Sequence, residues 1–157
     1  MTVLYPNSSL CGLQIKLTKS QSENHTIIQN HWIHFNTVLK KNNLTQNKGN
    51  WVKYGVTFKV EDTYYYLAAI PSSILILPEH FTTITIPQGN YHIFTHRGKM
   101  EGIKETLNDI YKIQIPKLNL QIQSSEKIGF IHFEKYDYRF QWNNPASTIE
   151  LYLPLEH

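Results

Sequence analysis

The chain has 157 residues, of which 41% are hydrophobic and 17% charged, so it can bury a core and its composition is not that of a disordered segment. Its formal charge of +3 comes without a basic run longer than Lys40-Lys41, which argues against a nucleic-acid-binding surface. No apolar stretch approaches the roughly 20 residues of a membrane helix. Because the single cysteine, Cys11, cannot form an internal disulfide and no secretory signal is visible, we expect a cytoplasmic protein.

The first half of the chain predicts a strand, a helix and a hairpin, in that order. Apolar residues alternate across 12–18, which indicates a strand. Across 25–41 they fall on one helical stripe, at Ile28, Trp32, Phe35 and Leu39. A polar loop at 42–50 then leads to two strands, 51–60 and 63–70, that flank the turn Glu61-Asp62.

The second half repeats this order of elements. The expected segments are a connector with a short strand at 71–79, a strand at 81–97 bent at Pro87-Gln88-Gly89, a helix at 100–112, an irregular stretch at 116–125, and strands at 128–136 and 148–154.

A strand, a helix and two strands thus occur twice, at about 10–70 and about 81–154. Two such modules pair into an antiparallel sheet with pseudo-twofold symmetry and a cleft between them, so the predicted class is α+β. We expect one domain over residues 1–157. Residues 156–157 resemble the remnant of a cloning tag and are left out of functional reasoning.

Acidic and aromatic side chains concentrate on the last two predicted strands. Because side chains alternate between the faces of a strand, Glu134 and Tyr136 share one face of the first and Phe133 lies on the other. Glu150 and Tyr152 likewise share one face of the last strand. We expect the two acids and two tyrosines to line a common cleft, with a helix covering the opposite, aliphatic face.

Five segments between residues 86 and 154 resemble, in the same order, the GyrI-like small-molecule-binding family. They are Ile86-Pro87-Gln88-Gly89-Asn90-Tyr91, Phe94-Thr95-His96-Arg97-Gly98, Gly102-Ile103-Lys104-Glu105-Thr106, Phe133-Glu134-Lys135-Tyr136-Asp137-Tyr138-Arg139-Phe140 and Glu150-Leu151-Tyr152-Leu153-Pro154. The chain departs from the family pattern at Gln88, usually Ala, and at Lys135, usually Arg. The family is related to the effector-binding domains of AraC-type and MerR-type multidrug regulators.

The resemblance implies a pocket between the two modules with aromatic walls, where a carboxylate at the position of Glu134 meets cationic or polar ligands. Some relatives hydrolyse strained electrophilic natural products, so the resemblance also admits an enzyme. In that case Glu134 and Tyr152 are the catalytic candidates. The residues alone favour a different reading of Glu134, an ordinary ion pair with Lys135 or Arg139.

Each further candidate for ligand binding also has an ordinary structural explanation, such as core packing or a surface position. Tyr136 and Tyr152 either contact a ligand or pack at the sheet edge, and Glu150 is either a second site acid or a surface charge. Tyr54, Tyr65 and Phe94 can line the cleft from other strands, although a bulge would reverse their faces. Core packing is the better interpretation of the helix residues Trp32 and Phe35.

No metal or cofactor site is expected. His31 and His34 have a ligand-like spacing, but no HExxH motif or cysteine pair accompanies them. Nucleotide-binding and serine-nucleophile motifs are missing from the sequence.

The sequence therefore predicts a stand-alone domain that binds an aromatic or cationic organic molecule, either sequestering a toxic compound or sensing a ligand. Only about a dozen residues precede the first predicted strand, so we expect no helix-turn-helix, no direct DNA binding and no membrane contact, with any signal passing through a protein partner. Two alternatives stay open: a hydrolase of strained-ring, cyclopropane-type toxins that uses Glu134, and a protein-interaction module of the gyrase-inhibitor type.

Overall fold

The computed structural model describes residues 1–46, 50–73 and 76–156, and it confirms the α+β class. Eight strands and several helices follow one another along the chain. The strands are β1 (Thr2–Tyr5), β2 (Ser8–Lys16), β3 (Lys53–Val60), β4 (Thr63–Pro71), β5 (Thr82–Ile86), β6 (Gly89–Arg97), β7 (His132–Tyr136) and β8 (Thr148–Pro154). The α-helices are α1 (Gln21–Lys41), α2 (Ile103–Asp109), α3 (Ile115–Leu118) and α4 (Ser125–Ile128).

The sheet confirms the predicted pseudo-symmetry of two modules. All pairs are antiparallel, and the strand order is β1-β6-β8-β7-β3-β4-β2-β5. The order β7-β8-β6 in one half therefore corresponds to β3-β4-β2 in the other, as a pseudo-twofold axis requires. The two halves meet at the β3–β7 ladder, which we call the seam. The middle of its five residue pairs is Gly55 opposite Glu134.

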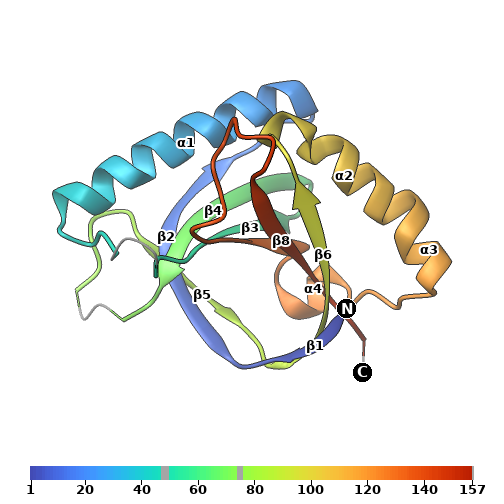
Figure 1. Ribbon diagram of the computed structural model, residues 1–157. Helices are drawn as coiled ribbons and strands as arrows, with labels where there is room; N and C mark the ends of the chain where they lie inside the picture. The colour runs from blue at the N-terminus through green and yellow to red at the C-terminus, as the bar shows by residue number, and fades with distance from the viewer. Residues whose placement is uncertain (47–49, 74–75, 157) are drawn as a thin grey trace.

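Two bent segments curl the sheet around (Figure 1). The chain from β1 to β2 turns at Pro6-Asn7, and the chain from β5 to β6 turns at Pro87-Gln88. Pairing continues on both sides of these bends, with Tyr5 opposite Gly89 and Ser8 opposite Ile86. The predicted bend in the strand at 81–97 is confirmed, but β1 was not predicted. The repeating unit is thus strand, strand, helix, strand, strand, and the first strand of each unit pairs with the other module.

Helix α1 begins earlier than predicted because Ser20 caps it, its side chain accepting a hydrogen bond from the Glu23 N–H at 3.3 Å. The helix ends at the predicted lysines, where cations suit the negative end of the helix dipole. Its buried stripe contains His31, Trp32, Phe35 and Leu39. The predicted core role of Trp32 and Phe35 is confirmed.

The second helical region is longer than predicted. A 3₁₀ turn (Met100–Gly102) leads into α2, and a wide π-helical turn (Ile110–Gln114) connects α2 to α3. Pro116 has no N–H for an α-helical ladder, and the wide turn before it, in which the Ile115 N–H bonds the Ile110 carbonyl, accommodates the proline. The prediction of irregular structure at 116–125 is therefore wrong at α3. Residues 125–128 form α4, so the strand expected from 128 begins only at His132.

Two predictions on connections fall partly on residues outside the described ranges. The polar loop at 42–50 includes residues 47–49, and the short strand expected within 71–79 includes residues 74–75. The neighbouring described residues, 72–73 and 76–79, do not form a strand.

The sheet separates two groups of buried side chains. Helices α1 and α2–α3 lie outside the curl (Figure 1), on what we call the helix face. The buried cluster on this face includes Trp32, Phe35 and Leu39 of α1 and Leu151 and Leu153 of β8. The opposite, inner face is built around Tyr54, Leu67, Tyr91, Phe133 and Tyr152. Among the described helices, none has the length and apolar character needed to cross a bilayer.

Candidate functional site

Glu134 occupies the middle of the sheet with its side chain on the helix face. It is directly opposite Gly55 on β3 and Leu151 on β8, and directly opposite residues of an antiparallel pair share a face. Only 5% of Glu134 is exposed. A carboxylate is thus held in the interior, where it is seldom found without a cationic partner.

Neutral aromatic groups, rather than cations, surround this carboxylate. The Tyr66 hydroxyl donates to Glu134 Oε1 at 2.8 Å, and Trp32 Nε1 donates to the Tyr66 oxygen at 3.0 Å. The Tyr136 hydroxyl lies 3.3 Å from the Tyr66 hydroxyl. Within residues 1–46, 50–73 and 76–156, no ion pair includes Glu134. The ion pair with Lys135 or Arg139 that the residues alone favoured is therefore not formed.

Burial raises the pKa of Glu134 from its ordinary value of 4.5 to about 7, because desolvation disfavours the carboxylate. The hydroxyls of Tyr66 and Tyr136 oppose this effect and lower the pKa. The same burial raises the pKa of both tyrosines well above its usual value, so their hydroxyls keep their protons. Glu134 is consequently the group here that changes charge near neutral pH.

Gly55 makes this arrangement sterically feasible. A Cβ atom at position 55 would lie 1.9 Å from the Tyr66 hydroxyl oxygen and 2.7 Å from Glu134 Oε1. The Tyr66 ring, itself 1% exposed, crosses the space that a side chain at position 55 would fill. Gly55, in the first module, thus leaves the space in which Tyr66 reaches Glu134 of the second module.

A pocket of about 320 Å³ lies on the helix face where the two modules meet. One wall is a single face of α1 with the spacing i, i+3, i+4, i+7: Gln29, Trp32, Ile33 and Asn36. The other walls are Trp51, which precedes β3, Lys53 at its start, Tyr136 at the end of β7, and Phe140 and Trp142 in the β7–β8 connection. Two of these residues, Trp32 and Tyr136, also contact the Tyr66 hydroxyl next to Glu134.

The pocket is mainly aromatic. Its rings form a chain of edge-to-face contacts, from Trp32 to Tyr136 with centroids 5.3 Å apart, from Tyr136 to Phe140 at 4.7 Å, and from Phe140 to Trp142 at 6.3 Å. The chain of 157 residues has three tryptophans, and all three line this pocket. Such rings offer flat apolar surface and electron-rich faces to a ligand.

The structure brings together two of the predicted site residues, Glu134 and Tyr136. Glu150 and Tyr152 lie instead on the inner face, where Tyr152 is directly opposite Phe133 and stacks on it at 4.6 Å. The prediction that both acids and both tyrosines share one face is wrong, because alternation orders residues within each strand but does not set the register between strands.

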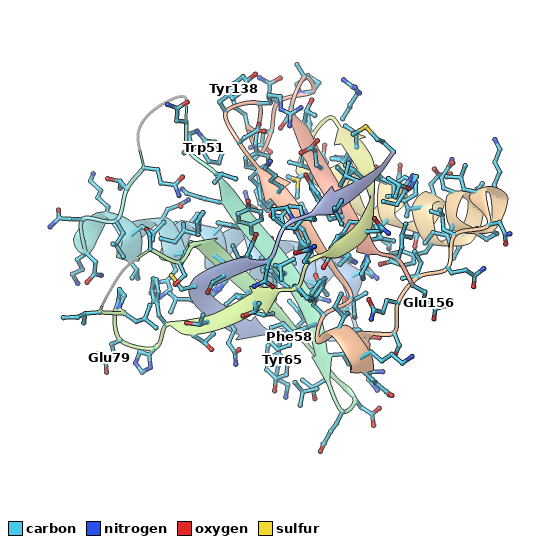
Figure 2. The ribbon with its side chains drawn as sticks, turned by 90° about the horizontal axis from the view of Figure 1, so that it is seen from below. Trp51, Phe58, Tyr65, Glu79, Tyr138 and Glu156 are labelled. Carbon is cyan, nitrogen blue, oxygen red and sulfur yellow. The ribbon has the colours of Figure 1, made fainter. Side chains whose placement is uncertain are left out.

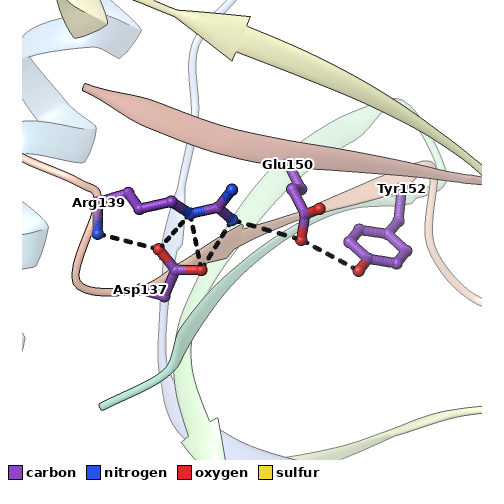
Figure 3. A network of polar contacts seen from close by, with 4 residues as sticks. All are labelled: Asp137, Arg139, Glu150 and Tyr152. Atoms are coloured by element: carbon purple, nitrogen blue, oxygen red, sulfur yellow. Dashed lines mark hydrogen bonds and ion pairs between the residues drawn. The ribbon is translucent and has the colours of Figure 1, made fainter. Parts of the chain in front are cut away.

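Glu150 belongs to a separate polar network (Figure 3). Arg139 forms a close pair with Asp137 at 2.8 Å and lies 3.8 Å from Glu150, which accepts a hydrogen bond from the Tyr152 hydroxyl at 3.3 Å. These contacts join the β7–β8 connection to β8. Glu150 therefore does not pair with Glu134 as a second site acid.

The other three predicted residues also lie away from the pocket. Tyr54 faces inward, and its hydroxyl accepts a hydrogen bond from Tyr5 at 3.4 Å. Tyr65 stacks on Phe58 at the far end of β3 from Trp51 (Figure 2). Phe94 is on the helix face but two strands from Glu134, opposite Leu151.

Sequence reasoning missed most of the pocket walls. Trp51, Phe140 and Trp142 lie outside regular strands or in a connection, so no periodicity indicates their direction. Tyr66 lies in a run of three tyrosines, and alternation there separates it from Tyr65 without showing which of the two is buried against the acid. A usable signal was Gly55 inside a strand, because such a glycine often marks a close approach of other atoms.

Comparison with known proteins assigns the chain to a family. Residues 3–155 match the family described as Cass2, integron-associated effector binding protein. The chain belongs to the Cass2 family. The resemblance to GyrI-like effector-binding domains is thereby confirmed, and as a Cass2 member the chain is an effector-binding domain for small molecules.

Relatives of this Cass2 domain include regulators and solved structures. The transcriptional regulator BrlR of Pseudomonas aeruginosa is 32% identical over 80 residues, which are 50% of this chain and 28% of BrlR, so the chain matches well under half of that regulator. SAV2435, solved bound to tetraphenylphosphonium, has a TM-score of 0.75 at 14% identity over 99% of this chain and 93% of its own. An integron cassette protein from the mobile metagenome of Vibrio cholerae has a TM-score of 0.68 at 16% identity, covering 99% and 95%. Both structures share the fold.

The first prediction concerns Gly55. We expect Gly55→Ala to displace Tyr66 from Glu134 and to lower the free energy of unfolding by about 1–3 kcal/mol, as overpacking of a buried site does. Gly89→Ala is the matched control, because a Cβ there would meet nothing closer than 3.9 Å. Urea denaturation measures both variants, and equal stability of the two would contradict the account of Gly55.

The second prediction concerns Glu134 and pH. The raised pKa means that the folded state holds a proton that the unfolded state releases between pH 4.5 and about 7, so wild-type stability falls across this window. Glu134→Gln lacks this loss and should be more stable than wild type by about 3 kcal/mol at pH 8, with no such advantage at pH 4.5. Thermal melts of both proteins across this pH range measure the difference in stability between them. Other titrating groups, such as His132, are present in both proteins, so their contributions cancel in this difference. A difference that does not vary with pH would contradict the raised pKa.

Proposed function

We propose that this domain binds an aromatic organic cation in the pocket between α1, β3 and the β7–β8 connection, with Glu134 as the buried counter-charge. The observation that carries the proposal is the environment of Glu134, a buried carboxylate that accepts a hydrogen bond from Tyr66. The Tyr66 hydroxyl in turn contacts Trp32 and Tyr136, which line the pocket. A protein core gains nothing from such a carboxylate, since an unpaired buried charge is costly. A cation that enters the pocket would offset that cost.

The pocket walls suit the same class of ligand. Aromatic faces attract cations through the ring quadrupole, and burial of the ligand's apolar surface adds to the binding free energy. SAV2435, which shares the fold, was solved with tetraphenylphosphonium, a cation with four aromatic rings. In the cell, the domain would either sequester a toxic compound of this kind or report its presence to a protein partner.

The third prediction tests the ligand class. Tetraphenylphosphonium should bind wild-type protein and quench its fluorescence, because all three tryptophans line the pocket. Glu134→Gln keeps the size of the side chain and its acceptor for Tyr66 but removes the charge, so affinity should fall about 10- to 100-fold, the usual size of a charge-assisted contact. Glu150→Gln, on the inner face, should bind as wild type does.

Equal affinity of wild type and Glu134→Gln would refute the assignment of Glu134. Mass spectrometry after incubation of wild type and Glu134→Gln with a strained-ring electrophile separates a binder from a hydrolase. A binder returns its ligand unchanged, whereas a product heavier by one water, formed from a strained electrophile and missing with Glu134→Gln, would make the domain an enzyme.

The fourth prediction is the pH dependence of binding. Since the pKa of Glu134 is about 7, the carboxyl is ionised above this pH and protonated below it. Tetraphenylphosphonium affinity should therefore be constant above pH 8, fall by up to tenfold per pH unit below pH 7, and level off once it reaches the affinity of Glu134→Gln. Titrations at several pH values measure this slope, and Glu134→Gln should bind weakly at all of them. A slope that persists in the variant would assign the effect to another group.

A further inference from the structure

Lys53 is the charged residue in the pocket wall. It starts β3 and is directly opposite Tyr136, two residue pairs along the β3–β7 ladder from the pair Gly55 and Glu134. Its side chain is therefore on the helix face, like that of Glu134. Among the described pocket-lining residues, it carries the one formal charge, and this charge is positive.

Lys53 and Glu134 do not pair, although they are neighbours on one face of the sheet. Lys53 Nζ donates to Asn36 Oδ1 on α1 at 2.7 Å and lies over the Trp51 ring, 5.4 Å from its centroid. Glu134 accepts from Tyr66 instead. None of the ion pairs between described residues includes Lys53.

Both charges are disfavoured where they are. Burial lowers the pKa of Lys53 and raises the pKa of Glu134, since each side chain has lost water without gaining an opposite charge. The acid is one hydrogen bond behind the pocket residues Trp32 and Tyr136, through the Tyr66 hydroxyl. The ammonium lies in the pocket wall and bonds Asn36 on α1. A ligand with charges of both signs would compensate the two groups at once.

We infer that the ligand of this pocket is a zwitterionic aromatic compound, with its cationic centre towards Glu134 and a carboxylate or similar anion at Lys53 and Asn36. The inference rests on the proposed function and narrows its ligand class. Asn36 fits this role, because its carbonyl oxygen already accepts from Lys53 and its amide N–H groups are left to donate to an anion. A ligand with positive charge alone is repelled by Lys53.

The test uses two probes that differ in one charge. The first is triphenylphosphonium with a carboxybutyl tail, which is a zwitterion at pH 8, and the second is its methyl ester, which is a cation. Tryptophan quenching gives the affinity of each probe for wild type, Lys53→Met, Asn36→Asp, Glu134→Gln and Lys59→Met. Lys59→Met is the matched control, because Lys59 is also on β3 and lies over the Tyr64 ring at 5.3 Å, outside the pocket lining.

Wild type should bind the zwitterion roughly tenfold more tightly than the ester, the size of one charge-assisted contact. Lys53→Met should abolish this preference, because it should lower the affinity for the zwitterion and raise the affinity for the ester. Asn36→Asp, at an exposed helix position with little risk to folding, should also abolish it by neutralising Lys53. Lys59→Met should keep the wild-type ratio of the two affinities, and Glu134→Gln should lower the affinity for both probes.

A wild-type protein that binds the ester as tightly as the zwitterion would overturn the inference and leave the proposed function standing. A preference that survives in both Lys53→Met and Asn36→Asp would also overturn it. If neither probe binds, or if Glu134→Gln lowers the affinity for neither probe, the proposed function fails together with the inference.

Discussion

A carboxylate buried at the seam of two modules needs a partner that replaces water, and the Tyr66 hydroxyl is that partner at 2.8 Å. This hydrogen bond needs β4, β3 and β7 in the observed register, because Tyr66 reaches Glu134 across Gly55. It also needs α1, whose Trp32 donates to the same hydroxyl. The hydrogen bond between Tyr66 and Glu134 therefore depends on the packing of α1 and on the register of the sheet, and it stabilises the charge of the site.

The pseudo-symmetry explains why one acid is present rather than two. Gly55 and Glu134 form the middle pair of the central ladder, so the approximate twofold relation exchanges them. Two carboxylates at these positions would repel each other and leave no room for Tyr66. The repeat supplies the scaffold, and its asymmetry at the seam produces a site with one buried negative charge.

Much of the fold was predictable, since it follows from local patterns. The stripe of α1, the hairpin of β3 and β4, and the limits of β8 agree with the sequence to within a few residues. The misses have physical reasons. The helix expected over 100–112 continues through a π turn into α3. Strand β1 is too short, with its side chains exposed or half-buried, to show a pattern. Of the site, Glu134 and Tyr136 were predicted and the family resemblance implied aromatic walls, but most of the residues that form those walls were not identified.

The sequence by itself determined the order of elements, the internal repeat, and the family motifs that single out Glu134. The tertiary structure decided which side of the sheet each residue faces, because register is a long-range property that alternation within a strand leaves free. It placed Glu150 opposite Lys135 and Tyr152 opposite Phe133, on the other face of the sheet from Glu134. It also gathered three tryptophans from distant segments around one pocket, since only packing of α1 on the sheet brings those segments together.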